Sequence, residues 1–237
     1  GGFFFFFIPQ YYYPIDQLKN EPKRRMNINR VGFCDITGQT NERTMLSAKI
    51  PAGVICGNKV PTIIFEDAAD QNLYSSCWLA IANSLPFDWL LRRVITTTLN
   101  YFILLQMPFP SIDPQSSNGR ILARLAESIC LNPTMPPWEK AEIRAEIDWR
   151  IVSVFGHDVN TVELMLEDFP LLDRAQPAIE REKYSTITKD FLLAKAAENL
   201  GGVKSSKINY WKNRYMLAQQ NGAAPYIPTC LSVCYAK

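Results

Sequence analysis

The hydrophobic periodicity of this chain changes near residue 70, and that change limits the possible fold more than any other feature. Between residues 30 and 65, short alternating runs are separated by turn-forming groups at residues 37–41, 51–53 and 57–58, which is typical of short antiparallel strands. From residue 72 onward, apolar residues recur mainly at three- and four-residue spacing, which predicts helices. The sequence therefore predicts an α+β fold: a small antiparallel β region followed by a mainly helical C-terminal half.

The predicted elements divide the chain into four regions. Residues 1–29 form an N-terminal aromatic strand and a basic loop, and residues 30–110 form an α+β core. Residues 111–200 form a helical region, and residues 201–237 form a last helix (207–220) and a tail. Within the core we expect one helix over residues 72–94, kinked at Pro86, and a buried strand over residues 99–107. Farther on, we expect helices over residues 120–130 and 188–200, a helix starting at Pro137, and a capping box from Asn160 to Glu163.

The N-terminus is strongly apolar between Phe3 and Ile8. This run is much shorter than the roughly 20 residues that cross a bilayer, and no basic segment or cleavage site of a signal peptide accompanies it. We therefore expect a cytoplasmic protein without a membrane partner. The aromatic residues at positions 3–8 and 11–13 are expected to pair with the β region or to pack against a neighbouring domain.

Charge is distributed unevenly, although the formal net charge is only +2. Lys and Arg outnumber Asp and Glu by seven to three between residues 19 and 49, and by eight to two between residues 183 and 237. Between residues 138 and 182, acidic residues outnumber basic ones by eleven to five. Local basic faces of this kind suit a polyanion, and they equally suit the solvated faces of ordinary helices.

We find no catalytic constellation and no metal site in the sequence. The chain has a single histidine, His157, which we place in a turn between two helices, and it has no glycine-rich phosphate loop. It also lacks the Asn-Pro-Pro-Tyr or Asp-Pro-Pro-Tyr tetrapeptide with which an amino-methylating enzyme holds a flipped base. Asp16, Glu21 and Lys23 superficially match a metal-dependent nuclease motif, but their carboxylates are close together for two strands that converge on a metal.

One segment resembles a known family. Residues 33–45, Phe33-Cys-Asp-Ile-Thr-Gly-Gln-Thr-Asn-Glu-Arg-Thr-Met45, are similar to a segment of the adenine-specific DNA methylases of type IIG restriction-modification enzymes and their phage-defence relatives. Further blocks follow in the same order, so the resemblance covers roughly residues 30–198. Cys34 stands where that family usually has a basic residue, and the tail from Gly201 has no counterpart. The further blocks are residues 50–54, 57–61, 79–92, 99–103, 106–110, 144–148, 168–177 and 185–190.

The resemblance implies a DNA target-recognition fragment that lies after a methylase core. Its partners would be double-stranded DNA and an upstream methyltransferase domain, in the cytoplasm of a prokaryote. The parent enzyme would use S-adenosylmethionine as its cofactor, with or without an additional endonuclease activity. This chain would bind no cofactor and would not be catalytic alone.

Nine residues are candidates for DNA contact. Asn41, Glu42 and Arg43 suit base edges, although Glu42 and Arg43 equally suit an internal ion pair that braces the β region. Asn100 suits a phosphate or the cap of a turn. The candidates for phosphate contact are Lys23, Arg24, Arg25, Arg92 and Arg93, of which the last two would also complement a helix dipole.

Two alternatives remain open from the sequence. The first is a helical protein-interaction module that supports a methylase or nuclease subunit. The second is a metal-dependent nuclease that uses Asp16, Glu21 and Lys23.

Overall fold

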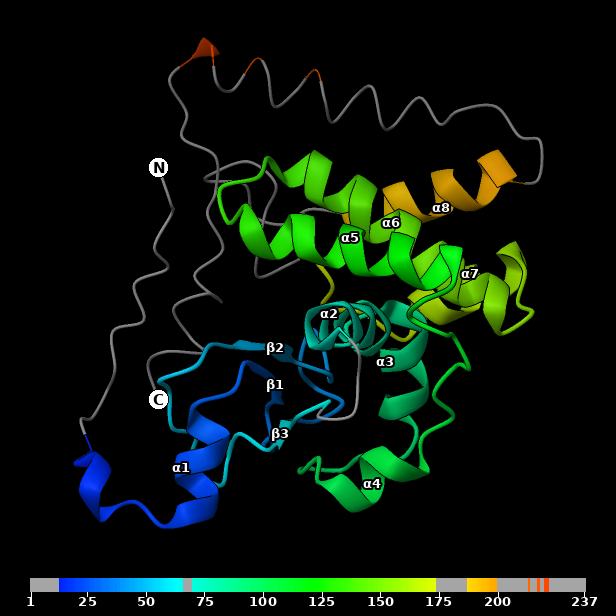
Figure 1. Ribbon diagram of the computed structural model, residues 1–237. Helices are drawn as coiled ribbons and strands as arrows, with labels where there is room; N and C mark the ends of the chain where they lie inside the picture. Colours follow the sequence, from blue (N-terminus) through cyan, green and yellow to red (C-terminus); the bar gives the residue numbers. More distant parts are fainter. Residues whose placement is uncertain are drawn as a thin grey trace.

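The computed structural model describes residues 13–65, 70–173 and 187–199, together with the single residues 213, 217, 220 and 221. Within them, a three-stranded antiparallel sheet lies at one end and helices form the rest of the molecule (Figure 1). The predicted α+β class, with a small β region before a mainly helical half, is confirmed. The aromatic segment before Tyr13, the helix expected over residues 207–220 and most of the tail lie outside the described residues.

The sheet has the order β2-β1-β3 and places the most buried strand at its centre. β1 (Arg30–Phe33) pairs with β2 (Ser47–Ile50), so that Arg30 faces Ile50, and with β3 (Thr62–Ile63), so that Val31 faces Ile63. Gly32 permits close packing here, because a Cβ atom on it would lie 3.0 Å from Ile50 Cγ1. All four residues of β1 are buried, which fixes the sheet against the helices.

The segment before the sheet is helical, where a loop was predicted. A single turn, η1 (Ile15–Gln17), precedes α1 (Asn20–Met26), which carries the basic run Lys23 to Arg25. Pro22 lies in the first turn of α1, where a backbone N–H has no helical partner and its loss costs little. Glu21 pairs with Arg24 one turn later at 3.0 Å, the spacing at which side chains meet on a helix.

Two helices occupy the segment predicted as one kinked helix. α2 (Gln71–Ala82) ends at Asn83, and α3 (Leu85–Arg92) begins after Ser84, whose extended backbone and side-chain bond to the Phe87 amide cap it. Pro86 lies in the first turn of α3, so it starts a helix rather than bending one. The prediction of one kinked helix is wrong because Ser84 caps a new helix, so the chain leaves the helical conformation before Pro86.

The buried strand predicted over residues 99–107 is a short surface helix, α4 (Tyr101–Gln106). Asn100 caps it, since its Oδ1 accepts the amide hydrogen of Ile103 at 3.0 Å. A short apolar run cannot be assigned to strand or helix by periodicity alone, and here the cap decides. The helix leaves Phe102 and Leu105 largely exposed.

The helical half contains α5 (Ser117–Leu131), α6 (Pro137–Val154), α7 (Val159–Glu167) and α8 (Ile187–Asn199). α5 packs on α2, which also contacts β1 and β2, and α6 packs on α8. The cap of α7 is Asp158, which accepts the amide hydrogen of Thr161 at 2.9 Å, so the capping box predicted from Asn160 is wrong by two residues. His157 lies between α6 and α7 as expected.

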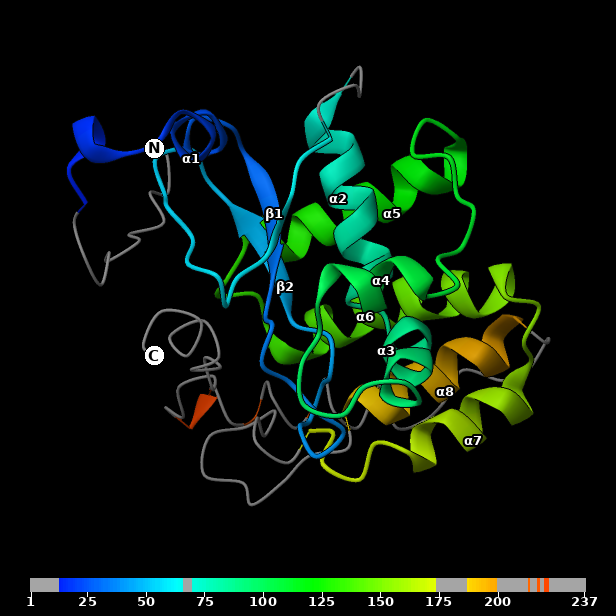
Figure 2. The same cartoon turned by 90° about the horizontal axis from the view of Figure 1, so that it is seen from below.

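The β region and the helical half share a hydrophobic core. One cluster joins Phe33 of the sheet to Leu122 of α5 and Ile151 of α6, and a second lies among α3, α6, α7 and α8 around Phe169 and Phe191. The views in Figures 1 and 2 show the same arrangement, with α2 between the sheet and α5 and α6. Consequently, residues 30–110 and the helical region pack as neighbours across a continuous apolar interior.

Candidate nucleic-acid interface

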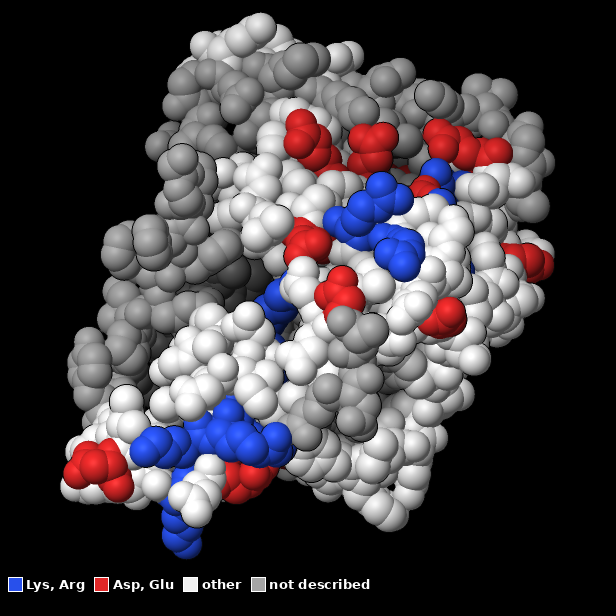
Figure 3. Space-filling view, in the orientation of Figure 1, with Lys and Arg blue, Asp and Glu red and all other residues white. Residues whose placement is uncertain are grey.

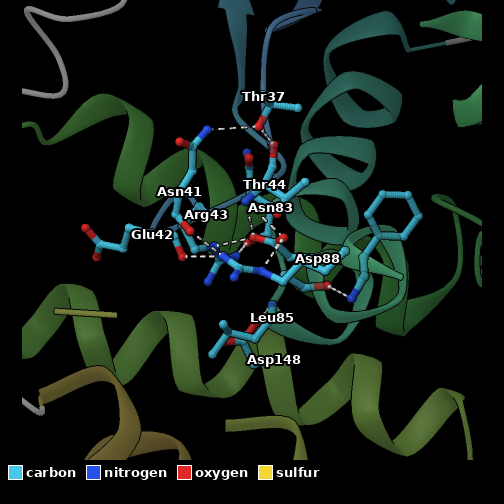
Figure 4. Close-up of polar contacts among 12 residues, drawn as sticks. Thr37, Asn41, Glu42, Arg43, Thr44, Asn83, Leu85, Asp88 and Asp148 are labelled. Atoms are coloured by element: carbon cyan, nitrogen blue, oxygen red, sulfur yellow. Dashed lines mark hydrogen bonds and ion pairs between the residues drawn. The ribbon is translucent and has the colours of Figure 1, made fainter. Parts of the chain in front are cut away.

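Residues 37–44 form a loop within the connection between β1 and β2. Thr37 is buried, and its hydroxyl donates to the Thr44 carbonyl at 2.6 Å. Asn41 donates from Nδ2 to the Thr37 hydroxyl at 3.3 Å, while the residue itself is exposed. These contacts fold the loop back on itself (Figure 4).

Asp88 of α3 holds this loop from inside the protein. Its side chain is fully buried, and its two oxygens accept the Thr44 amide hydrogen at 3.0 and 3.1 Å. Arg43 Nε lies 2.9 Å from Asp88 Oδ2, and Arg43 Nη2 donates to the Asn83 carbonyl. The side chain of Arg43 is only 20% exposed. The predicted base-contacting arginine therefore points inward and braces the loop, and its acidic partner is Asp88 rather than Glu42.

Arg92 closes the same network from one turn farther along α3. It is buried, and its Nη2 donates to the carbonyls of Asn41 at 2.8 Å and Glu42 at 2.7 Å. Its Nη1 donates to the Gln39 carbonyl at 3.0 Å, and its guanidinium lies 4.1 Å from the centre of the Phe169 ring. Burial lowers the pKa of Arg92, and the Asp88 carboxylate opposes that shift. Arg92 lies in the last turn of α3, the position from which it was predicted to complement the helix dipole. It was also predicted as a phosphate contact, but both of its terminal nitrogens donate to loop carbonyls.

Glu42 joins the loop to the end of the helical half. Its Oε1 accepts the amide hydrogen of Asp173 at 3.1 Å. Asp173 has a left-handed backbone, with φ 66°, a conformation that Asp tolerates better than most residues. The Asp173 carboxylate accepts the Thr188 amide hydrogen at 2.8 Å and the Thr188 hydroxyl at 2.5 Å. Burial raises the pKa of Asp173 to about 6.

Asp148 of α6 supports α3 in a similar way. Its Oδ1 accepts the Leu85 amide hydrogen at 2.7 Å, at the first turn of α3, and burial raises its pKa to about 6. Sequence reasoning missed Asp88, Asp148 and Asp173 alike. A signal existed for Asp88, because it is a charged residue within the apolar run 85–91, where an unpaired charge would be costly.

Arg93 lies at the surface beside this network. Its side chain is 56% exposed and pairs with Asp168, and its guanidinium lies 5.2 Å from the centre of the Trp89 ring. Trp89 Nε1 donates to the same Asp168 carboxylate at 2.5 Å. Arg93 thus remains accessible to an anion, although Asp168 neutralises part of its charge.

The remaining predicted cations, Lys23, Arg24 and Arg25, lie on α1, and Lys19 directly precedes this helix. We call Lys19, Lys23, Arg24 and Arg25 the basic corner; Figure 3 shows a large blue group at the lower left, where Figure 1 places α1. Lys19 and Lys23 are exposed, and neither has an acidic partner among the residues that the structure describes. Arg24 is also exposed and forms two bonds of 3.0 Å with Glu21. The basic corner is therefore an accessible positive surface.

Thr62 of β3 connects the basic corner to α4. Arg25 Nη2 donates to the Thr62 carbonyl at 2.6 Å and to its hydroxyl at 2.9 Å. The Tyr101 hydroxyl accepts the Thr62 amide hydrogen at 2.8 Å and donates to the Thr62 carbonyl at 2.9 Å. The end of α1 and the start of α4 consequently meet at one residue. Asn100 caps α4, one of its two predicted roles.

The geometry does not favour the nuclease alternative. Asp16 lies on η1 and Glu21 on α1, not on converging strands, and the Glu21 carboxylate is bonded to Arg24. No group of three or more His, Cys, Asp or Glu residues that could hold a metal ion occurs in the described part of the chain.

The buried cysteine Cys77 is a poor candidate for a nucleophile. Burial raises the pKa of the Cys77 thiol to about 11, which disfavours the reactive thiolate.

Comparisons with known proteins add no assignment. No protein-family model, no curated protein and no solved structure matches this chain. Among the described residues, none of the helices has the length and apolar character needed to cross a bilayer.

Proposed function

We propose that this chain is a DNA-binding target-recognition part of an adenine-specific DNA methylase or restriction-modification enzyme. Two things support the proposal: the resemblance of residues 30–198 to that family and the accessible positive surface of the basic corner. Lys19 and Lys23 of the basic corner carry the argument, because both are exposed and neither has an acidic partner among the described residues, which leaves them available for phosphate contact. S-adenosylmethionine and the catalytic step would belong to an upstream methyltransferase domain of the parent enzyme, in the cytoplasm of a prokaryote.

The DNA-contacting roles that we propose for these residues differ from the roles expected from the sequence. Phosphate contacts fall first to Lys19 and Lys23, beside Arg24 and Arg25, which pair with Glu21; such contacts set position without reading sequence. Loop 37–44 acts as a scaffold, because Arg43 and Arg92 direct their donors into the protein. Asn41 is exposed, and the bond from its side chain to Thr37 is long at 3.3 Å, so it is the remaining candidate in this loop for a base edge.

Salt dependence of binding tests the proposal. Removing one phosphate contact should reduce the slope of log K against log salt by about 0.9. We therefore expect the double variant Lys19→Ala, Lys23→Ala to bind duplex DNA with a slope smaller by about two, and to keep the melting temperature of the wild type. Binding would be measured by fluorescence anisotropy with a labelled duplex of about 30 base pairs at several salt concentrations.

Arg124→Ala is the matched control, since Arg124 is an exposed cation on α5. It should leave the slope unchanged. Absence of binding by the wild type at low salt, or equal slopes for all three proteins, would contradict the proposal.

A protein-interaction module is the second candidate. Phe102 and Leu105 on α4 are 71% and 83% exposed. A pocket of about 350 Å³ is lined by residues of α3 and α4 and of the segments that follow them, including Val94, Ile103 and Met107. A partner protein held by this surface would bind with little dependence on salt, so the same titration separates the two candidates.

A further inference from the structure

We propose that α4 acts as an apolar wedge, with Phe102 and Leu105 inserting between or stacking on bases of the DNA whose phosphates the basic corner holds. This inference rests on the proposed function and assigns a second contact surface to it. Insertion of one or two apolar side chains at a base step partly unstacks it and kinks the duplex.

Exposure singles out these two side chains. Leu105 and Phe102, at 83% and 71%, are the two most exposed large apolar side chains among the described residues. They are three positions apart on a helix, so they project from the same face. The opposite face is anchored, since Leu104 is buried and Ile103 packs against the main core cluster. The two side chains are thus presented together and pointing away from the core.

The helix that carries them is firmly held. The Asn100 cap fixes its first turn, and the Tyr101 hydroxyl makes two bonds to the backbone of Thr62. The Tyr101 ring also meets Phe33 edge-on, with ring centres 5.7 Å apart. A side chain on a fixed support loses little conformational freedom when it inserts, so more of the stacking energy contributes to binding.

The charged and polar groups around α4 indicate which kind of partner binds to this surface. Arg25 and Tyr101 share Thr62, so one cation of α1 lies beside the start of α4; both helices lie at the lower edge of Figure 1, and Figure 2 looks onto that side. Immediately before α4, residues 96–98 and Asn100 are exposed and carry hydroxyl and amide donors. A cation and neutral donors around one aromatic and one aliphatic side chain suit a partner that is anionic on its backbone and aromatic inside, which is nucleic acid.

An anionic membrane is a poorer match for the same surface. Interfacial helices commonly bury a long apolar face, whereas α4 has six residues and offers two outward apolar side chains.

Plasmid unwinding provides a test that does not depend on knowing the recognition sequence. The chain is bound to a relaxed closed plasmid, topoisomerase I is added, and the linking number is read on a gel after the protein is removed. Wild-type protein should shift the linking number, because inserted side chains untwist base steps. The double variant Phe102→Ala, Leu105→Ala should lose most of this shift and bind about tenfold more weakly, with an unchanged salt slope.

Two further variants make the result specific. Phe102→Trp should keep the linking-number shift, because indole stacks at least as well as phenyl. Leu131→Ala removes an apolar side chain that is 66% exposed on α5 and should behave as the wild type. Suppose that the wild type binds DNA with the expected salt dependence but does not shift the linking number, or that the double variant shifts it equally. Either result would overturn the wedge and leave the proposed function standing.

Failure of the wild type to bind plasmid at low salt would overturn both proposals. In that case, binding to phosphatidylserine vesicles that the double variant loses would assign the surface to a membrane. Binding to neither would leave a protein partner as its occupant.

Discussion

Loop 37–44 and the basic corner are both rich in polar and basic residues, but they use them in opposite ways. In the loop, Arg43 and Arg92 turn inward and bond to Asp88 and to backbone carbonyls. In the basic corner, Lys19 and Lys23 face solvent without an acidic partner among the described residues. The difference arises from Asp88, a fully buried carboxylate that draws the neighbouring guanidinium groups into the protein. A segment rich in polar residues can therefore serve to stabilise the fold, while the accessible positive charge lies on a short basic helix.

The sharpest test of this difference removes the buried carboxylate. Asp88→Ala should destabilise the protein by about 3–5 kcal/mol, because it leaves the Arg92 guanidinium buried without its counter-charge and the Thr44 amide without an acceptor. Urea unfolding followed by circular dichroism measures the change. Asp16→Ala is the control, since Asp16 is exposed and should change the free energy of unfolding by less than about 0.5 kcal/mol. Equal effects of the two substitutions would mean that the buried network does not brace the loop.

The second test concerns pH and Asp148. Burial raises the pKa of this carboxyl from 3.8 to about 6, so the folded protein holds the proton more tightly than the unfolded chain does. The stability that this group contributes is fully present below about pH 3.8 and is lost as the pH rises through about 6. The full difference corresponds to about 3 kcal/mol.

Asp148→Asn isolates that contribution, because its amide oxygen can still accept the Leu85 amide hydrogen and it carries no charge at any pH. The free-energy difference between variant and wild type should therefore move in favour of the variant from pH 4 to pH 7. Other carboxyls, such as Glu146, have lowered pKa values and act in the opposite direction, so the comparison is made as a difference between the two proteins. A difference that does not change between pH 4 and pH 7 would contradict the assigned shift.

The third test asks whether Arg43 stabilises loop 37–44 or contacts a DNA base. Arg43→Ala should cost about 1.5–3 kcal/mol of stability, the range for a hydrogen bond to a charged group. If DNA is the partner, as we propose, the substitution should weaken binding to cognate and scrambled duplexes equally, because the Arg43 guanidinium points into the protein. Melting temperature and competition binding below that temperature measure the two effects. Unchanged stability with a loss confined to the cognate duplex would make Arg43 a base reader and remove the contrast between the two regions.

The sequence predicts the coarse fold well because periodicity reports burial directly. The alternation around Val31 and Phe33 and the three- and four-residue spacing behind Pro137 both correspond to observed elements. Local capping was the main source of error. Ser84 divides one predicted helix into two, and Asn100 turns an apolar run into a helix rather than a strand.

The candidate site was harder to predict, because exposure depends on partners that are distant in the sequence. The inward orientation of Arg43 depends on Asp88, 45 positions away, and the environment of Glu42 depends on Asp173. Nothing in the local pattern distinguishes Arg92, which is buried, from Arg93, which is exposed. Charge runs therefore identify cations but not which of them reach solvent.

The bond from Glu42 to Asp173 spans 131 positions, and this separation has a consequence for the order of folding. Arg92 likewise reaches the Asp168 carbonyl, 76 positions away. As the chain is synthesised, β1 and β2 emerge long before these partners exist, so loop 37–44 cannot complete its contacts until the end of α7 has been made. Contacts between such distant positions carry a large loop-closure entropy and slow folding. Among the described residues, the loop between β1 and β2 is thus one of the last parts to complete its contacts.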